Sequence, residues 1–373
     1  MKIVWFTWKD LRHPHAGGAE VLNEQIAARL ARDGHAVTLV VAGFAGGAEK
    51  EQVNGYTVVR VGGRYTVYLK AGQYFKRYLS DNVDLVIEEV NTVPFLTALY
   101  TKRTPSIYLF YQLCRQIWFY QMVFPLSLVG YVAEPVYLRY MAWQKRPVLT
   151  ESQSTKDDLV HYGFKRHNTT VFRVGIETKP VSDLSTITKY DQPTMLSLGA
   201  IRNMKRPHHQ IEAFELAKKD LPKLQLIIAG AGSGRYVTKV MDLIATSPFH
   251  KDIHYLGKVS KEKKIELMQK SHVICVTSVK EGWGLIVTEA NSQGTVAVVY
   301  NVDGLRDSVR HNKTGLICTK NTPTELATCV VDVLKDQAKY SVLRQNAWKW
   351  SKELTFETSY QDVLAVIHKT VGS

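Results

Sequence analysis

Two glutamates, Glu281 and Glu289, stand eight positions apart on either side of a segment rich in glycine and apolar residues. The apolar run 272-HVICVT-277 predicts a strand that ends shortly before them, and a helix is expected to begin near Gly284. Glu281 then lies in the loop at the carboxyl end of the strand, and Glu289 lies in the helix. Such a pair is either an acid/base couple or two separate anchors for a ligand's hydroxyl groups.

The residues between the two glutamates favour the second interpretation. Helix-end amides near Gly284 and Leu285 would point at a phosphate. The carboxylate of Glu281 can accept hydrogen bonds from sugar hydroxyls, and that of Glu289 can accept two from a vicinal diol such as a ribose. This is the layout of a nucleotide sugar, and the expected contacts in this stretch are Glu281, Gly282, Trp283, Gly284, Leu285, Ile286 and Glu289.

A basic loop, 199-GAIRNMKRP-207, connects another expected strand to a helix that Pro207 can start. Arg202 and Lys205 lie in this loop at the carboxyl edge of the sheet. Fixed cations there suit a diphosphate, because arginine binds it bidentately and lysine acts as a point charge. A solvated basic loop is the alternative.

Two glycine-rich loops also follow expected strands. Gly17 and Gly18, in 14-PHAGGAE-20, and Gly230 and Gly232, in 230-GAGSGR-235, permit close approach of the backbone to a phosphate or a base. Neither loop has the dinucleotide fingerprint or the Walker lysine. Each is therefore equally consistent with an ordinary tight turn.

These loops need a scaffold of strands and helices to position them, and the sequence predicts two. In the first half, strands expected at 2–8, 36–42, 84–90, 106–113 and 147–150 are separated by helical patterns. The second half starts the alternation afresh, with strands expected at 194–200, 224–230, 252–257, 272–277 and 296–300. Strands separated by helices indicate βαβ units and parallel sheets. The fold class is α/β, with two Rossmann-like doubly wound domains facing a cleft at the strands' carboxyl ends.

Composition agrees with two folded domains. A chain of 373 residues with 45% hydrophobic residues exceeds one ordinary domain. Residues 1–180 hold 22 basic and 15 acidic residues and residues 181–373 hold 26 and 19, so each half carries +7. Charge spread this evenly favours anionic small ligands or an acidic membrane surface over a nucleic-acid groove. Four dispersed cysteines and a strand-like N-terminus predict a cytoplasmic protein with reduced thiols.

One uncharged stretch, residues 116–133, lies between Arg115 and Glu134. It is close to the shortest length of a membrane span, but Gln121 and Pro125 weaken that interpretation. We expect a helical segment that is mostly buried or interfacial.

The stretch 280-KEGWGLIVTEANSQGTVAVV-299 resembles the E-x7-E signature of the retaining nucleotide-sugar glycosyltransferases of family 4, which have the GT-B fold. Further similar segments run along essentially the whole chain, among them 17-GGAE-20, 87-IEEVNTVPF-95, 151-ESQSTKDDL-159 and 304-GLRDSV-309. The resemblance implies an acceptor-binding domain at 1–178, a nucleotide-sugar-binding domain at 179–350, and a C-terminal helix at 351–373 that packs back on the first domain.

The resemblance also implies roles for residues. Glu281 matches the contact with the donor's sugar hydroxyls, Glu289 the ribose contact and Lys205 the diphosphate contact. We expect Glu281, Arg202 and Lys205 to form the catalytic set, with Arg202 in place of an arginine that the family has elsewhere in this loop. Two positions depart from the family's pattern. This chain has Ala200 where many relatives have arginine, and it has Tyr111 or Gln112 where many have a histidine near the transferred sugar.

The expected activity is transfer of a hexose from a UDP- or GDP-linked donor, with retention of configuration, in glycan or cell-surface polysaccharide synthesis. No cofactor and no metal ion are expected, since the sequence holds no Asp-x-Asp motif and no ligand cluster. The acceptor is a saccharide or a lipid-linked saccharide. For the latter, the aromatic 108–141 region predicts a peripheral protein on the anionic inner face of the plasma membrane. The alternatives are a non-catalytic nucleotide-sugar-binding or partner-binding paralogue and, less favoured, a nucleic-acid-binding protein.

Overall fold

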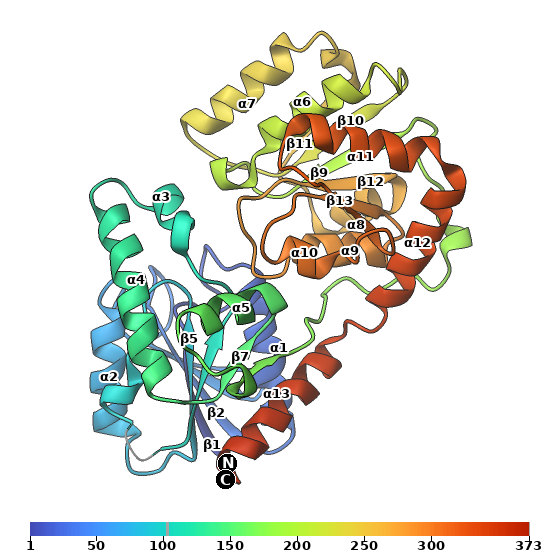
Figure 1. The fold of residues 1–373 in the computed structure, drawn as a ribbon. Helices are drawn as coiled ribbons and strands as arrows, with labels where there is room; N and C mark the ends of the chain where they lie inside the picture. Colours follow the sequence, from blue (N-terminus) through green and yellow to red (C-terminus); the bar gives the residue numbers. More distant parts are fainter. Residues whose placement is uncertain (102–103, 373) are drawn as a thin grey trace. The chain divides into compact units, whose positions relative to one another are not determined.

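Two separate β-sheets organise the chain in the computed structural model, which describes residues 1–101 and 104–372. Each sheet belongs to its own unit (Figure 1). Unit 1 comprises Met1–Gly175 with Thr355–Ser373, and unit 2 comprises Ile176–Leu354. The two-domain α/β fold class is confirmed. The boundaries expected at 178/179 and 350/351 fall a few residues from those of the units.

Unit 1 contains an eight-stranded sheet in the order β3-β4-β2-β1-β5-β6-β7-β8. All its neighbouring strands are parallel except β3 and β4, which form an antiparallel hairpin at one edge. Its strands are β1 (Lys2–Phe6), β2 (Ala36–Val41), β3 (Lys50–Val53), β4 (Tyr56–Arg60), β5 (Leu85–Val90), β6 (Ser106–Phe110), β7 (Val148–Thr150) and β8 (Thr169–Val171). Every residue of β5 and β6 is buried, because helices cover both faces of the sheet.

The helices of unit 1 are α1 (Gly18–Arg32), α2 (Val67–Tyr78), α3 (Trp118–Gln121), α4 (Leu126–Trp143), α5 (Gln153–His161) and α13 (Phe356–Val371), with short 3₁₀ turns η1 (Thr97–Leu99), η2 (Arg115–Ile117) and η3 (Arg166–Asn168). The right-handed rule for parallel crossovers places α2, η1 and α4 on one face of the sheet and α1 on the other.

The C-terminal helix α13 belongs to unit 1 and packs on α1 (Figure 1). The Tyr360 hydroxyl donates to Asp33 Oδ2 at 2.6 Å, and the Gly175 amide donates to Ser359 Oγ at 2.8 Å. Arg173 forms an ion pair with Asp362 at 2.6 Å. The preceding helix α12 (Gln337–Ser351) lies in unit 2, so the chain passes back to unit 1 between α12 and α13. The predicted return of the last helix to the first unit is confirmed.

Unit 2 contains a six-stranded parallel sheet in the order β11-β10-β9-β12-β13-β14. Its strands are β9 (Thr194–Leu198), β10 (Gln225–Ala229), β11 (Ile253–Gly257), β12 (Val273–Val276), β13 (Val296–Val299) and β14 (Gly315–Ile317). Its helices are α6 (Pro207–Ala217), α7 (Arg235–Thr246), α8 (Lys261–Lys270), α9 (Leu285–Ser292), α10 (Leu305–Ser308), α11 (Pro323–Lys335) and α12, with 3₁₀ turns η4 (Leu184–Thr186), η5 (Asn203–Lys205) and η6 (His250–Asp252). The strand order reverses between β9 and β12, where doubly wound sheets bind ligands.

Residues 116–133 form a helical hairpin rather than one buried segment. They span parts of η2, all of α3 and the first half of α4. Ile117 and Trp118 are buried as expected, but Val123 and Phe124 at the turn are 75% and 78% exposed. Of the helices in the described part of the chain, none is both long enough and apolar enough to cross a bilayer. All four cysteines are free thiols.

Candidate nucleotide-sugar site

A cavity of about 170 Å³ lies at the point in unit 2 where the strand order reverses. The loop that follows β9 forms one wall and the loop that follows β12 forms the other. Lys205 and Glu281, which are 76 positions apart in sequence, both line it. The parallel pairing of β9 with β12 brings their carboxyl ends together and thereby unites the two residues.

Lys205 and Glu281 form an ion pair inside this cavity. The Ser278 hydroxyl donates to the same carboxylate oxygen, Glu281 Oε1, at 2.5 Å. The Lys205 side chain is 36% exposed, whereas that of Glu281 is 17% exposed. The structure therefore presents a partly solvated cation beside a carboxylate that is held in place by a neighbouring hydroxyl.

Hydrogen bonds between the two loops fix the walls of the cavity. The Val279 amide donates to the carbonyl oxygen of Met204 at 2.8 Å, and the Thr277 hydroxyl donates to that of Lys205 at 2.9 Å. Gln210 on α6 donates from Nε2 to the Thr277 hydroxyl at 2.9 Å. Its Oε1 atom is buried without a hydrogen-bond partner in the described structure, and the residue lines the cavity. Gln210 is thus poised to accept a hydrogen bond from a ligand.

The loop between Glu281 and α9 rests on the loop that follows β13. The Glu281 amide donates to the Asp303 carbonyl oxygen at 3.1 Å, and Lys280 forms an ion pair with the Asp303 carboxylate at 2.8 Å. Gly284 caps α9 with a φ of +96°, and a Cβ there would lie 2.8 Å from Leu305. Only glycine meets both conditions, so Gly284 allows the sharp turn that begins α9. No side chain caps this helix, and its first backbone amides are therefore available to bind an anion.

The remaining predicted residues around the start of α9 differ in their surroundings. Gly282 lies in the same loop, and Ile286 lines the cavity. Trp283 packs instead against Trp350 of α12, with ring centroids 6.1 Å apart. Leu285 is the first residue of α9 and is half-buried.

Glu289 lies within α9, buried against α8. Its Oε2 pairs with Lys264 of α8 at 2.7 Å, and its Oε1 accepts a weaker hydrogen bond from the Thr178 hydroxyl at 3.4 Å. It does not line the cavity that contains Lys205 and Glu281. The two glutamates therefore occupy separate surroundings and do not form an acid/base couple with each other.

The glycine loop after β10 packs directly on the loop after β9. Gly230 has a φ of +151°, and a Cβ at this position would lie 1.8 Å from the carbonyl oxygen of Gly199. A Cβ on Gly232 would lie 2.4 Å from the carbonyl oxygen of Ile201. Close backbone packing explains both glycines, whatever contact they make with a ligand.

Replacing Gly230 by alanine is expected to destabilise unit 2 by about 2–4 kcal/mol, because backbone strain and overpacking add. Gly234→Ala is the matched control, since Gly234 also has a positive φ (+82°) but a Cβ on it would meet no atom within 4 Å. Urea unfolding followed by tryptophan fluorescence measures both. Equal midpoints for the two variants would show that the close approach to Gly199 is unimportant.

Arg202 is exposed at the start of η5 and does not line the cavity. Ala200 does line it. Within residues 1–101 and 104–372, no group of three or more histidine, cysteine, aspartate or glutamate residues is placed to hold a metal ion.

The predicted residues of unit 1 gather at the start of α1 and the end of β6. Gly17 caps α1, and its amide donates to Glu20 Oε2 at 2.6 Å. Gly18 is the first residue of the helix. Glu20 also pairs with Lys9 at 3.2 Å. In this structure the helix therefore caps itself with its own carboxylate, and an anion at Gly17 would have to displace Glu20.

Tyr111 and Gln112 follow β6, and the Tyr111 side chain belongs to a buried network. Its hydroxyl donates to Asn23 Oδ1, and Asn23 donates from Nδ2 to Glu89 Oε2 at 2.5 Å. Burial, with Glu20 nearby, raises the pKa of Glu89 to about 8. The Gln112 side-chain oxygen is buried with no partner among the described atoms.

Three residues of the site escaped the sequence analysis: Ser278, Gln210 and Lys264. Ser278 adjoins the expected strand end and could have been found from its position alone. Gln210 and Lys264 lie on helices, and tertiary packing decides which side of each helix faces the site. No local sequence signal therefore identifies these two residues.

The fold is similar to that of several solved structures. The chain aligns over 99% of its length with sucrose-phosphate synthase from Thermosynechococcus elongatus (98% of that chain, 18% identity, TM-score 0.79) and with HepE of Anabaena in complex with UDP-glucose (100% of that chain, 20% identity, TM-score 0.72). It aligns similarly with WaaG, a glycosyltransferase involved in lipopolysaccharide biosynthesis (97% of this chain, 98% of that chain, 16% identity, TM-score 0.73). These likenesses define the GT-B fold.

Family models match both units. Residues 16–179 match the model described as Glycosyltransferase Family 4, and residues 185–350 match that of Glycosyl transferases group 1. The chain belongs to glycosyltransferase family 4, as its motifs indicated.

Curated relatives match only part of the chain. D-inositol 3-phosphate glycosyltransferase of Jonesia denitrificans is 25% identical over 177 residues, which is 46% of this chain and 42% of the relative. N-acetyl-alpha-D-glucosaminyl L-malate synthase of Bacillus anthracis is 22% identical over 48% of this chain and 44% of the relative. The matched region spans less than half of the length of these relatives.

Proposed function

We propose that the protein transfers a hexose from a UDP- or GDP-linked donor to a saccharide or lipid-linked saccharide in glycan or cell-surface polysaccharide synthesis. The observation that carries the proposal is the Lys205–Glu281 pair in the cavity at the reversal of strand order. A cation and a carboxylate side by side match a donor with a diphosphate next to a sugar. HepE, which shares the fold, binds UDP-glucose.

Each residue of the site has a distinct proposed role. When the donor binds, Lys205 exchanges its ion pair with Glu281 for one with the diphosphate. The backbone amides of α9 that follow Gly284 contact the same phosphates. Glu281, held by Ser278, accepts hydrogen bonds from the sugar hydroxyls. Glu289, oriented by Lys264, accepts those of the ribose. Arg202 is the second cation, and it reaches the diphosphate from the exposed tip of its loop.

We propose a front-face reaction with retention of configuration. The bond from the anomeric carbon to the diphosphate oxygen breaks, while the acceptor oxygen bonds to that carbon on the same face. The acceptor's proton passes to the departing diphosphate. Lys205, Arg202 and the helix-end amides, rather than a metal ion, stabilise the charge on the leaving group.

A screen of UDP-, GDP- and ADP-sugars in the presence of a chelator tests this proposal. We expect one donor to raise the melting temperature of unit 2 by mass action and to be hydrolysed slowly without added metal. A protein that binds no nucleotide sugar, or that hydrolyses one only with a divalent cation, would contradict the proposal.

A non-catalytic nucleotide-sugar-binding or partner-binding paralogue is the second candidate function. It is favoured by one observation, namely that the Tyr111 hydroxyl is bonded to Asn23 inside the core. The screen separates the two functions, because a binding paralogue would be stabilised by a donor without hydrolysing or transferring it.

To reach a lipid-linked acceptor, the enzyme would have to bind at a membrane surface. For that acceptor we propose a cytoplasmic, peripheral protein on the inner face of the plasma membrane.

A further inference from the structure

Apolar side chains gather on one part of unit 1. Fifteen of the twenty exposed large hydrophobic residues in the described structure lie between residues 65 and 143. They belong to α2, to η1 and its approach, and to the α3–α4 hairpin. The Tyr68 ring of α2 packs on Phe95, with ring centroids 4.9 Å apart, and Phe95 leads into η1. Leu96 and Leu99 at η1 line one groove together with residues of α4, so the three elements adjoin one another. We call this part of unit 1 the α2–η1–α4 face.

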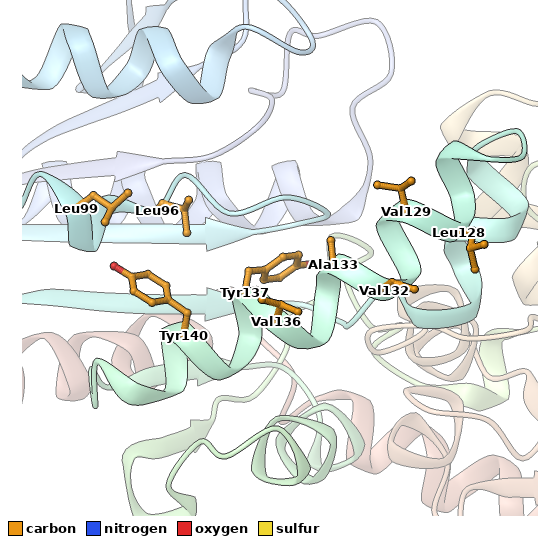
Figure 2. Close-up of a pocket in the computed structure, with 9 residues that line it drawn as sticks. All are labelled: Leu96, Leu99, Leu128, Val129, Val132, Ala133, Val136, Tyr137 and Tyr140. Atoms are coloured by element: carbon orange, nitrogen blue, oxygen red, sulfur yellow. The ribbon is translucent and has the colours of Figure 1, made fainter.

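An apolar groove of about 860 Å³ runs along this face between η1 and α4 (Figure 2). Leu96 and Leu99 line one side, and Ala133, Val136 and Tyr140 lie on the other. Its lining contains no charged side chain, and the Tyr137 hydroxyl points away to donate to the Thr92 carbonyl oxygen at 2.7 Å. From Leu128 to Tyr140 it follows α4 for about 18 Å. Such a surface offers hydrocarbon packing and almost no hydrogen bonds.

The hairpin that ends this face is rigidly assembled. The buried carboxylate of Glu134 accepts hydrogen bonds from the amides of Cys114 and Arg115, both at 2.7 Å, and from Trp118 Nε1 at 3.0 Å. The Trp118 ring lies so close to Gly130 that a Cβ on this glycine would be 2.4 Å from it. These interactions hold α3 on α4 and leave Val123 and Phe124 projecting at the turn.

The charge of the face indicates what it contacts. Within the described residues, segments 61–80, 91–101 and 104–147 build the face, and they contain eight basic residues and one acidic residue, Glu134. Because Glu134 is buried, the exposed charge of the face is positive. A second copy of the chain would place like charges opposite one another, whereas an anionic lipid surface is complementary.

We propose that the α2–η1–α4 face docks on an anionic lipid bilayer, with Val123 and Phe124 inserted among the acyl chains and the basic residues among the head groups. The inference deepens the proposed function, because it identifies the partner of the acceptor-binding unit as a membrane and favours a lipid-linked acceptor over a free saccharide. The groove beside α4 accommodates lipid tails along the same surface (Figure 2).

Co-sedimentation of the full chain with vesicles of phosphatidylcholine, with or without phosphatidylglycerol, tests the inference. We expect binding to the anionic vesicles that weakens as salt is raised. The double variant Val123→Asp/Phe124→Asp should lower this affinity on the order of 100-fold, since two apolar side chains lose their insertion. Lys76→Ala/Arg77→Ala should lower it roughly 30-fold and reduce the salt dependence.

Val342→Asp is the matched control, because Val342 is also an exposed apolar residue, on α12 of unit 2. It should bind vesicles as the parent does. If the parent chain stays in the supernatant with anionic vesicles, or if the turn variant changes only the oligomeric state in light scattering, the inference is overturned. Donor hydrolysis in solution should persist in the turn variant. Loss of donor binding with vesicle binding intact would instead contradict the proposed function alone.

Discussion

Replacing Lys205 by alanine is expected to lower kcat for sugar transfer roughly 100- to 1,000-fold, the range seen when one preorganised donor to a developing anion is removed. Lys205 is the cation that lines the cavity and pairs with Glu281. Its main contribution is expected in the transition state, when charge accumulates on the leaving diphosphate. The KM for the donor should therefore change less than kcat.

Two further variants make this test specific. Lys219→Ala removes an exposed lysine just beyond α6 in the same unit and should leave kcat within about twofold, as a distant surface charge does not act in the transition state. Glu281→Gln keeps an acceptor for the Ser278 hydroxyl but breaks the ion pair, so it separates loss of loop structure from loss of charge. A Lys205→Ala enzyme with near-normal kcat would show that the diphosphate is stabilised elsewhere.

Replacing Glu89 by glutamine is expected to stabilise unit 1 at neutral and alkaline pH but not at pH 5. Burial raises the pKa of Glu89 from 4.5 to about 8 in the folded chain. Between these values the folded state holds a proton that the unfolded state has released, so stability falls as pH rises, by up to about 1.4 kcal/mol per pH unit. The loss accumulates to about 3 kcal/mol by pH 7, and glutamine removes it.

Calorimetric melting of unit 1 at several pH values measures this effect. Glutamine retains an oxygen that can accept the hydrogen bond from Asn23, so packing of the network is preserved. Glu49→Gln, at an exposed position in the same unit, is the control and should follow the parent at every pH. If the parent and Glu89→Gln melt in parallel across the range, Glu89 does not hold a proton in the folded chain.

The sequence was sufficient to predict the strands that build the centre of each sheet. Segments 84–90 and 272–277 each contain an uninterrupted apolar stretch, 85–87 and 273–276, as expected for strands covered on both faces, and the structure contains β5 and β12 there. The edge hairpin of β3 and β4 was missed, because residues 50–53 are polar and partly exposed and therefore resemble a loop.

The sequence could predict which residues lie together where chain topology decides the contacts. Lys205 and Glu281 each follow a strand of a parallel sheet, so both had to reach the same edge, and they meet there as an ion pair. Contacts that depend on side-chain packing or on the separation of loops could not be predicted. The pairing of Glu289 with Lys264 depends on how α8 lies against α9. Likewise, the close packing of Gly230 on Gly199 depends on the separation of two loops that no local pattern reveals.

The return of α13 to unit 1 has a consequence for the order in which the chain folds during synthesis. Tyr360 bonds to Asp33, a residue translated more than three hundred codons earlier. The surface of α1 that α13 covers therefore stays exposed until the ribosome has synthesised all of unit 2. Unit 2 is one continuous stretch and can fold as it emerges. Unit 1, although it is synthesised before unit 2, is thus completed after it. A chain released from a ribosome that stalls within unit 2 would lack α13 and would expose the apolar surface of α1.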